Sequence, residues 1–253
     1  EFDRDGNVVK HPVWPQSRFL ARMAPKASEQ VLPVALEIPE TSNFYVHKDL
    51  TEAACEIEVP PELAAEWAKK EIKWIQKQDT LFSLLAEQLG TLMSRLASRG
   101  QTEVALDLAE ALLDVRPDPK AEEKQDENGY GGLPLDPRGL FDIWRYESIL
   151  EENIPDVVNA AGLRALRLLC GLLEKAICLS LRKRDDGVFE DFSYIWRPAI
   201  EEHEQNRGGG LRDPLVSAVR DAAESLMQDH GPAVLSVVEG RDYRFLEVCV
   251  YQL

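Results

Sequence analysis

The sequence has little basic charge, no long uninterrupted apolar run and none of the common catalytic motifs. Its 253 residues include 29 Lys and Arg but 45 Asp and Glu, which gives a formal net charge of −16. A chain of this charge repels phosphate backbones, so nonspecific binding of nucleic acid is disfavoured. The most apolar stretch, residues 165–181, is interrupted by Arg167, Glu174 and Lys175, which argues against a membrane span. These absences favour a protein whose partners are other proteins.

The chain has four cysteines. Cys170 and Cys178 fall in one predicted helix, where a rise of about 1.5 Å per residue separates them by about 12 Å, too far for a disulfide. Cys55 and Cys249 lie in other apolar runs, where buried thiols are the simpler interpretation and a single bridge stays an alternative. A reducing cytoplasm is the expected location.

No residue cluster completes a catalytic or cofactor site. His203-Glu204 begins like the zinc-protease helix motif, but position 207 holds Arg207 where that motif needs its second histidine. The glycines at positions 208–210 follow a helical segment and no Lys-Ser or Lys-Thr pair completes them, so they predict an inter-helix loop and not a phosphate-binding loop. We therefore expect no catalytic residue, no cofactor and no resident metal.

Two groups of residues still have a chemical interpretation. Four adjacent side chains have the composition of a divalent-ion site, although a solvated helix face explains them more simply: Glu201, Glu202, His203 and Glu204. The histidines have no catalytic spacing, and each is expected at the surface or at a helix end: His11, His47, His203 and His230. A metal-dependent enzyme built on the first group stays an alternative function.

Amphipathic helices follow one another along most of the chain. The clearest apolar register runs at helical spacing up to Gly100, a typical position after a helix: Leu81, Leu85, Leu89, Leu92 and Leu96. Thr102 opens the next helix and Pro117 stops it. The pattern predicts an all-α protein of about ten helices.

Prolines, glycines and capping residues set the other expected boundaries. The expected elements are a helix from Pro15 to Pro25, an extended segment over residues 31–38, a helix capped by Ser42 or Asn43, a helix separated from it by Pro60-Pro61, a helix continuing from about 157 to 181, and a helix from Asp213-Pro214 to Gly231.

The hairpin at residues 81–117 resembles a single tetratricopeptide-type repeat. Leu89-Gly90 is similar to the Leu-Gly pair of that repeat's first helix, Ala105 to the small residue of its second helix, and Pro117 to its terminator. Met93 and Ala109 stand where the family has aromatic residues. The resemblance implies irregular stacked helical hairpins of a HEAT or tetratricopeptide-like α-solenoid, and not membership of a peptide-binding family.

The composition changes abruptly at residues 118–138, which are rich in Lys, Glu, Asp, Gly and Pro and predict a solvated loop or linker. This change predicts an N-terminal helical lobe over residues 1–117 and a C-terminal helical lobe over residues 139–253. The dense apolar cluster at residues 245–251 leads us to expect that the natural polypeptide continues beyond this chain.

These patterns favour a noncatalytic scaffold or sensor module that contacts a protein or a neighbouring domain of its own polypeptide. A regulatory segment of a nucleotide-driven defence or signalling machine is the second interpretation. Aromatic and arginine side chains are the usual interface anchors, and the candidate anchors, for which core packing is the competing role, are Trp144, Tyr146, Phe192, Tyr194, Trp196 and Arg197.

Overall fold

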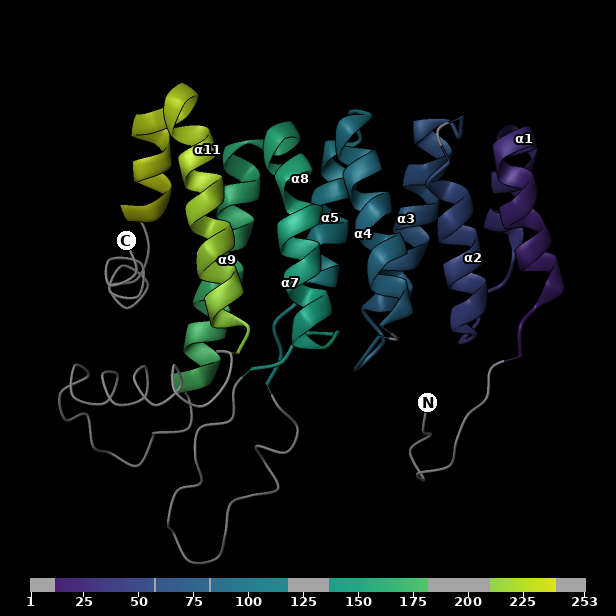
Figure 1. Cartoon of the computed structure of the whole chain (residues 1–253), viewed down its shortest axis with the longest axis horizontal. Coiled ribbons are helices and arrows are strands. Elements are labelled where there is room, and N and C mark those ends of the chain that lie inside the picture. The colour runs from purple at the N-terminus through teal and green to yellow at the C-terminus, as the bar shows by residue number, and fades with distance from the viewer. Residues whose placement is uncertain (1–11, 57, 82, 118–136, 182–209, 240–253) are drawn as a thin grey trace, which may run out of the picture. The chain divides into compact units, whose positions relative to one another are not determined.

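Nine α-helices occur in the residues that the computed structural model describes, which are 12–56, 58–81, 83–117, 137–181 and 210–239 (Figure 1). The β structure in these residues is an isolated bridge between Arg116 and Arg138. The all-α prediction is therefore confirmed for this part of the chain. Contacts divide the chain into a first unit, Glu1–Leu112 with Glu152–Ala161, and a second unit, Leu113–Glu151 with Gly162–Leu253.

The helices of the first unit begin and end where capping residues and prolines place them. They are α1 Pro15–Glu37, α2 Phe44–Ala54, α3 Pro61–Ile75, α4 Leu84–Ser98, α5 Thr102–Leu112 and α8 Ile154–Ala161. The Asn43 side chain accepts a hydrogen bond from the backbone N–H of Tyr45 at the start of α2, and Pro61 occupies the first turn of α3. Gly100 follows α4 with a φ of +80°, a conformation that glycine adopts without strain. The three boundaries agree with the sequence prediction.

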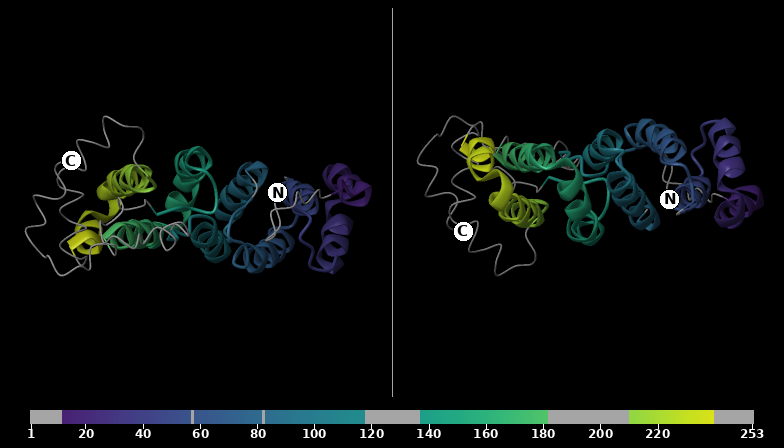
Figure 2. Two further views of the ribbon diagram at one scale, coloured as in Figure 1. Left: turned by 90° about the horizontal axis from the view of Figure 1, so that it is seen from below. Right: turned by 90° about the horizontal axis from the view of Figure 1, so that it is seen from above.

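Each early helix of the first unit packs against both the next helix and the one after it. Thus α1 contacts α2 and α3, α2 contacts α3 and α4, and α3 contacts α4 and α5, while α8 closes against α4 and α5. Figure 2 shows these helices side by side, viewed roughly along their axes. Their shared core contains the largest fully buried side chains of the unit, among them Trp67, Leu50, Ile75, Leu85, Leu89, Leu92, Met93 and Leu108.

Gly90 lets α4 and α8 approach each other closely. A Cβ atom at position 90 would lie 2.2 Å from Oδ1 of Asn153, the residue before α8. The Asn153 amide nitrogen donates a hydrogen bond to Oγ of Ser94, one turn further along α4, at 3.3 Å. The small residue of the Leu89-Gly90 pair therefore has a packing role in this chain.

The second unit contains α7 Ile143–Glu152 except for its last residue, together with α9 Leu163–Leu181 and α11 Arg212–Glu239, and α9 packs against α11. Tyr146 of α7 is buried, and its hydroxyl donates a hydrogen bond to the carbonyl of Leu113 at 2.9 Å. The ammonium of Lys175 on α9 lies 2.5 Å from Oδ1 of Asp114. These contacts fasten the segment after α5 to α7 and to α9.

The structure corrects the predicted conformation of residues 31–38. They are expected to be extended, but α1 continues through residue 37 after a kink at Ala27, whose φ is −152°. The kink separates Pro25 from the following turns, and Val31, Leu32 and Ala35 are buried on one face of the continuing helix. Burying this face favours the helix despite Pro33.

Two other predicted boundaries also change. The helix expected over 157–181 breaks at Gly162, where φ is +56°, into α8 and α9. The helix expected to end at Gly231 kinks at His230 and continues to Glu239. Because α8 packs on α4 and α5, the contacts also place residues 152–161 with the first unit, whereas the sequence assigns them to the C-terminal lobe. Residues 118–136 of the predicted loop lie outside the described residues.

None of the described helices combines the length and the apolar character that crossing a bilayer requires.

Gly90→Ala tests the close approach of α4 and α8. The added methyl group displaces the Asn153 side chain from Ser94, so we expect a loss of about 1–2 kcal/mol of unfolding free energy, even though Ala is the better helix former. Gly171→Ala is the matched control, because no atom lies within 4 Å of the position that its methyl group would take, and the change is expected to stabilise by about 0.5–1 kcal/mol. Urea unfolding followed by circular dichroism measures both, and equal stabilisation by the two variants would contradict a packing role for Gly90.

Candidate functional site

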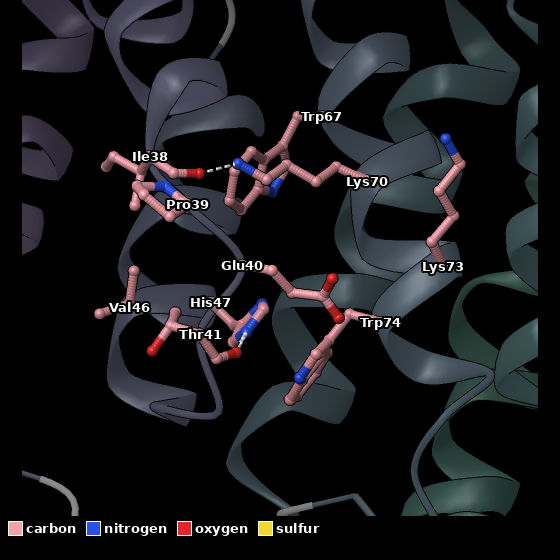
Figure 3. Close-up of a pocket in the computed structure, with 10 residues that line it drawn as sticks. All are labelled: Ile38, Pro39, Glu40, Thr41, Val46, His47, Trp67, Lys70, Lys73 and Trp74. Carbon is pink, nitrogen blue, oxygen red and sulfur yellow. Dashed lines mark hydrogen bonds between the residues drawn. The ribbon is translucent and has the colours of Figure 1, made fainter.

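A pocket of about 90 Å³ lies in the first unit where the segment after α1 meets α2 and α3 (Figure 3). The segment after α1 contributes Ile38, Pro39, Glu40 and Thr41, and α2 contributes Val46 and His47. The remaining wall comes from α3, through Trp67, Lys70, Lys73 and Trp74. The pocket therefore joins aliphatic and aromatic walls to two lysines.

The base of this site is a buried hydrogen-bonded pair between α2 and α3. The side chain of His47 is 6% exposed and that of Glu71 is fully buried. Nδ1 of His47 lies 2.8 and 3.0 Å from the two carboxyl oxygens of Glu71. On the other side of the ring, Nε2 lies 2.8 Å from the carbonyl oxygen of Thr41 (Figure 3). Both ring nitrogens are thus engaged inside the protein.

The acceptors around His47 determine where its protons lie. The Thr41 carbonyl can only accept, so Nε2 carries a proton and donates it. One further proton then completes the bond between Nδ1 and Glu71. Burial raises the pKa of Glu71, against the opposing effect of the hydrogen bond from His47. That proton is shared between Nδ1 and the carboxyl group, and burial of Glu71 shifts it toward the carboxyl oxygen.

This pair offers no reactive group to a substrate. A histidine that acts as a general base or metal ligand needs a ring nitrogen lone pair directed at its target. Nδ1 is bound to Glu71 and Nε2 donates to Thr41, so neither ring nitrogen presents a free lone pair. The pair therefore has a structural role beside the pocket.

The two tryptophans of the pocket are also held in place. The indole of Trp74 stacks on the imidazole of His47, with the ring centroids 3.6 Å apart and the planes inclined by 15°. Trp67 is buried, and its Nε1–H donates to Oγ1 of Thr51 at 3.1 Å. These contacts fix the aromatic walls before any ligand arrives.

The lysines of α3 differ in their surroundings. The Lys70 ammonium donates to the carbonyl oxygens of Ile38 and of Leu36, the latter at 3.2 Å, at the end of α1. It lies 5.6 Å from the centroid of the Trp67 ring, and partial burial lowers the pKa of Lys70. Cations at the C-terminal end of a helix are stabilised by the exposed carbonyls there. Lys70 therefore anchors the end of α1 over the pocket.

A second polar network holds α1 against α2. Ser17 donates to Oδ2 of Asp49 at 2.8 Å, and the guanidinium of Arg18 contacts both Asp49 and Glu52, at 3.2 and 2.9 Å. Asp49 is buried and these contacts compensate its charge. The network is a structural contact that positions the helix whose end forms the pocket rim.

The structure separates the interface anchors predicted from the sequence. Trp144 on α7 is 76% exposed, which leaves its indole available to a partner. Tyr146 is a correction, because its ring is buried, its hydroxyl is bound to Leu113, and burial raises its pKa well above the ordinary value. Core packing is its role. The other predicted anchors lie outside the described residues: Phe192, Tyr194, Trp196 and Arg197.

The alternative metal cluster, Glu201, Glu202, His203 and Glu204, also lies outside the described residues. Within the described part of the chain, no three His, Cys, Asp or Glu side chains are grouped as a metal site. Cys55 is a thiol that donates to the carbonyl of Gln88 at 3.6 Å, and burial raises its pKa to about 12. A thiol with that pKa is not ionised near neutrality and is a poor nucleophile.

His47 is buried, which corrects the expectation that the histidines lie at the surface or at helix ends. Glu71 is a residue of the site that the sequence does not predict. The signal that could have identified both is their position on the apolar faces of their helices. In α3, Glu71 follows Ala64 by seven residues and Trp67 by four, so it lies on the helical face that carries the core. A carboxyl group on such a face needs a buried partner, and His47 lies on the corresponding face of α2, between Phe44 and Thr51.

Glu71→Ala removes one partner of the buried pair. Nδ1 of His47 loses its hydrogen bond and a cavity forms beside it, so we expect a loss of about 3–5 kcal/mol of unfolding free energy. Glu71→Gln is the matched variant, because an amide nitrogen can donate to Nδ1 in place of the protonated carboxyl, and it is expected to cost about 1 kcal/mol or less. Glu66→Ala, at an exposed position of α3, is the control for charge. Equal losses for Ala and Gln at position 71, measured by urea unfolding, would contradict this hydrogen bonding.

The pKa of Glu71 also predicts a pH dependence. Because the folded-state pKa is raised above the ordinary value of 4.5, the contribution of this group is fully present below pH 4.5 and is lost as the pH rises through the folded-state value. We expect the unfolding free energy of the native chain, relative to that of Glu71→Gln, to decrease as the pH rises above 4.5. Within that window the slope is at most about 1.4 kcal/mol per pH unit. Unfolding at stepped pH values measures it, and a relative gain on raising the pH would show that the ionised carboxylate is the bound form.

No family model matches the chain, and comparisons with curated proteins and with solved structures give no significant match. The functional argument therefore depends on the residues of the site.

Proposed function

We propose that this chain is a noncatalytic helical scaffold or sensor module that binds another protein or another domain of its own polypeptide. One observation carries the proposal: the His47–Glu71 pair satisfies its hydrogen bonds within the fold and shapes a pocket without presenting a reactive group. A preformed concave site with apolar walls and a few charged groups is typical of recognition. The buried thiol of Cys55 adds no nucleophile to this site.

The arrangement of the helices supports the same proposal. In the first unit, α1 to α4 each contact the following helix, and α1 to α3 also contact the helix after that. Contacts of this kind are expected when helical hairpins stack as in HEAT or tetratricopeptide-like solenoids, whose repeated surfaces bind proteins. We propose this architecture for the first unit on that basis, with the hairpin of α4 and α5 as the part that resembles a tetratricopeptide-type repeat.

Trp144 is the proposed anchor for a partner on the second unit. It is the most exposed of the large apolar side chains that the structure describes. Tryptophan is among the residues that contribute most to protein interfaces, because one side chain buries a large area at a small cost in conformational entropy.

A photo-crosslinking amino acid at position 144 tests the binding function. In native host cells we expect a discrete covalent adduct from position 144 and none from Asp107, an exposed position on α5. The adducted protein, once purified, is expected to bind the native chain about 30-fold more tightly than Trp144→Ala, as an interface anchor of about 2 kcal/mol requires.

Arg145→Ala is the control for this measurement, because Arg145 is an exposed neighbour of Trp144 on α7. It is expected to change the affinity by less than about threefold, as most contacts outside an anchor do. Identical adducts at positions 144 and 107, or equal affinities of the native chain and Trp144→Ala, would reject Trp144 as the anchor of a binding module.

A further inference from the structure

The pocket beside His47 has the size of an aliphatic side chain. Its volume of about 90 Å³ is smaller than the roughly 150 Å³ cavity that admits benzene in an engineered protein core. An aromatic ring would therefore need the walls to move, whereas the branched or unbranched side chains of Leu, Ile, Val or Met need less space. The apolar lining favours such a side chain over a polar group, which would lose hydrogen bonds to water on entering.

The walls cannot easily move apart. The His47 ring is held from both sides and stacks on Trp74, Trp67 is bound to Thr51, and Lys70 fastens the end of α1. A pocket that is already formed lets a ligand bind without first ordering the protein, which improves the affinity that a small contact area can provide.

The charges at this pocket are opposite in sign to the charge of the whole chain. Glu40, the one acidic side chain in the lining, is paired with Lys77 at 2.6 Å. Lys70 and Lys73 then remain, and among the described residues neither ammonium forms a salt bridge, although the nearby carboxyl groups of Glu71 and Glu40 interact electrostatically with Lys70. A local excess of positive charge in a chain of net charge −16 favours an acidic ligand at this position.

We propose that this pocket receives an aliphatic side chain from an acidic segment of a partner protein, whose carboxylates pair with Lys70 and Lys73. The inference rests on the proposed binding function and specifies the chemistry of the partner at a site separate from Trp144. The two lysines supply orientation and the pocket supplies selectivity for the side chain. Exposed ion pairs contribute little alone, so both features are needed for binding.

The test uses the full chain labelled with 5-fluorotryptophan and followed by fluorine NMR, with each resonance assigned by a Trp→Phe variant. The probe is a capped peptide of aspartate and glutamate with a single central leucine. We expect saturable shifts of the Trp67 and Trp74 resonances with a dissociation constant on the order of 0.1–1 mM, and no shift of Trp144. A peptide with serine in place of leucine, and a peptide with asparagine and glutamine in place of the acids, are each expected to bind at least about tenfold more weakly.

Lys73→Glu reverses one of the two proposed charges and is expected to weaken the probe by about tenfold or more. Lys69→Glu is the matched control on the same helix, because Lys69 pairs with Glu66 outside the pocket, and it is expected to change binding by less than about threefold. Lys73→Gln removes the charge without introducing repulsion, and the fluorine spectrum of each free variant reports whether the pocket remains folded.

Equal binding of the leucine and serine peptides would overturn the inference, because no side chain would then occupy the pocket. Equal binding to the native chain and to a folded Lys73→Glu variant would also overturn it, as would the absence of a saturable shift at Trp67 and Trp74. None of these outcomes changes the adduct expected at position 144. Failure of this inference is therefore distinguishable from failure of the proposed function.

Discussion

The hydrogen bonds of His47 hold together the three segments that form the pocket. One ring nitrogen connects α2 to Glu71 on α3, and the other connects it to the carbonyl of Thr41 in the segment after α1. These groups are buried, so each would carry an uncompensated desolvation cost without its partner. Two further positions depend on this arrangement. Trp74 of α3 stacks on the His47 imidazole, and Lys70, also on α3, donates to the last carbonyls of α1.

A polar pair fixes this geometry more narrowly than an apolar pair of similar size. Apolar packing is nearly non-directional and allows side chains to change rotamer when a ligand arrives. Hydrogen bonds restrict both distance and angle, so they hold the plane of the imidazole and with it the indole stacked upon it. Buried polar pairs are often no more stabilising than apolar side chains of similar size, and the gain here is a wall of defined geometry for the pocket.

The sequence predicts most of this fold wherever one local cause dominates. Asn43, Pro61 and Gly100 set helix boundaries through their own side chains or backbone preferences, and these boundaries are confirmed. Pro33 favours an extended conformation for residues 31–38, but burial of Val31, Leu32 and Ala35 outweighs the lost backbone hydrogen bond. Propensity is a weak guide where tertiary packing opposes it.

The candidate site is less predictable, because its residues are brought together only by the packing of α1, α2 and α3. His47 and Glu71 are 24 positions apart, and no motif spacing relates them. Their one sequence signal is that each polar residue occupies the apolar face of its helix. The break at Gly162 is also hard to predict from the sequence. The apolar pattern continues through residues 157–181 and does not indicate that Gly162 adopts a φ of +56° and interrupts the helix.

The acidic net charge does not decide what approaches the pocket. At physiological ionic strength the field of an exposed charge falls off over about 8–10 Å, so distant carboxylates of the chain do not cancel Lys70 and Lys73 locally. The acidic segment that we propose as ligand would experience weak repulsion from the protein at long range and attraction only close to α3. The few groups around the pocket would then set the strength of binding, and the aliphatic contact would contribute the part that salt does not screen.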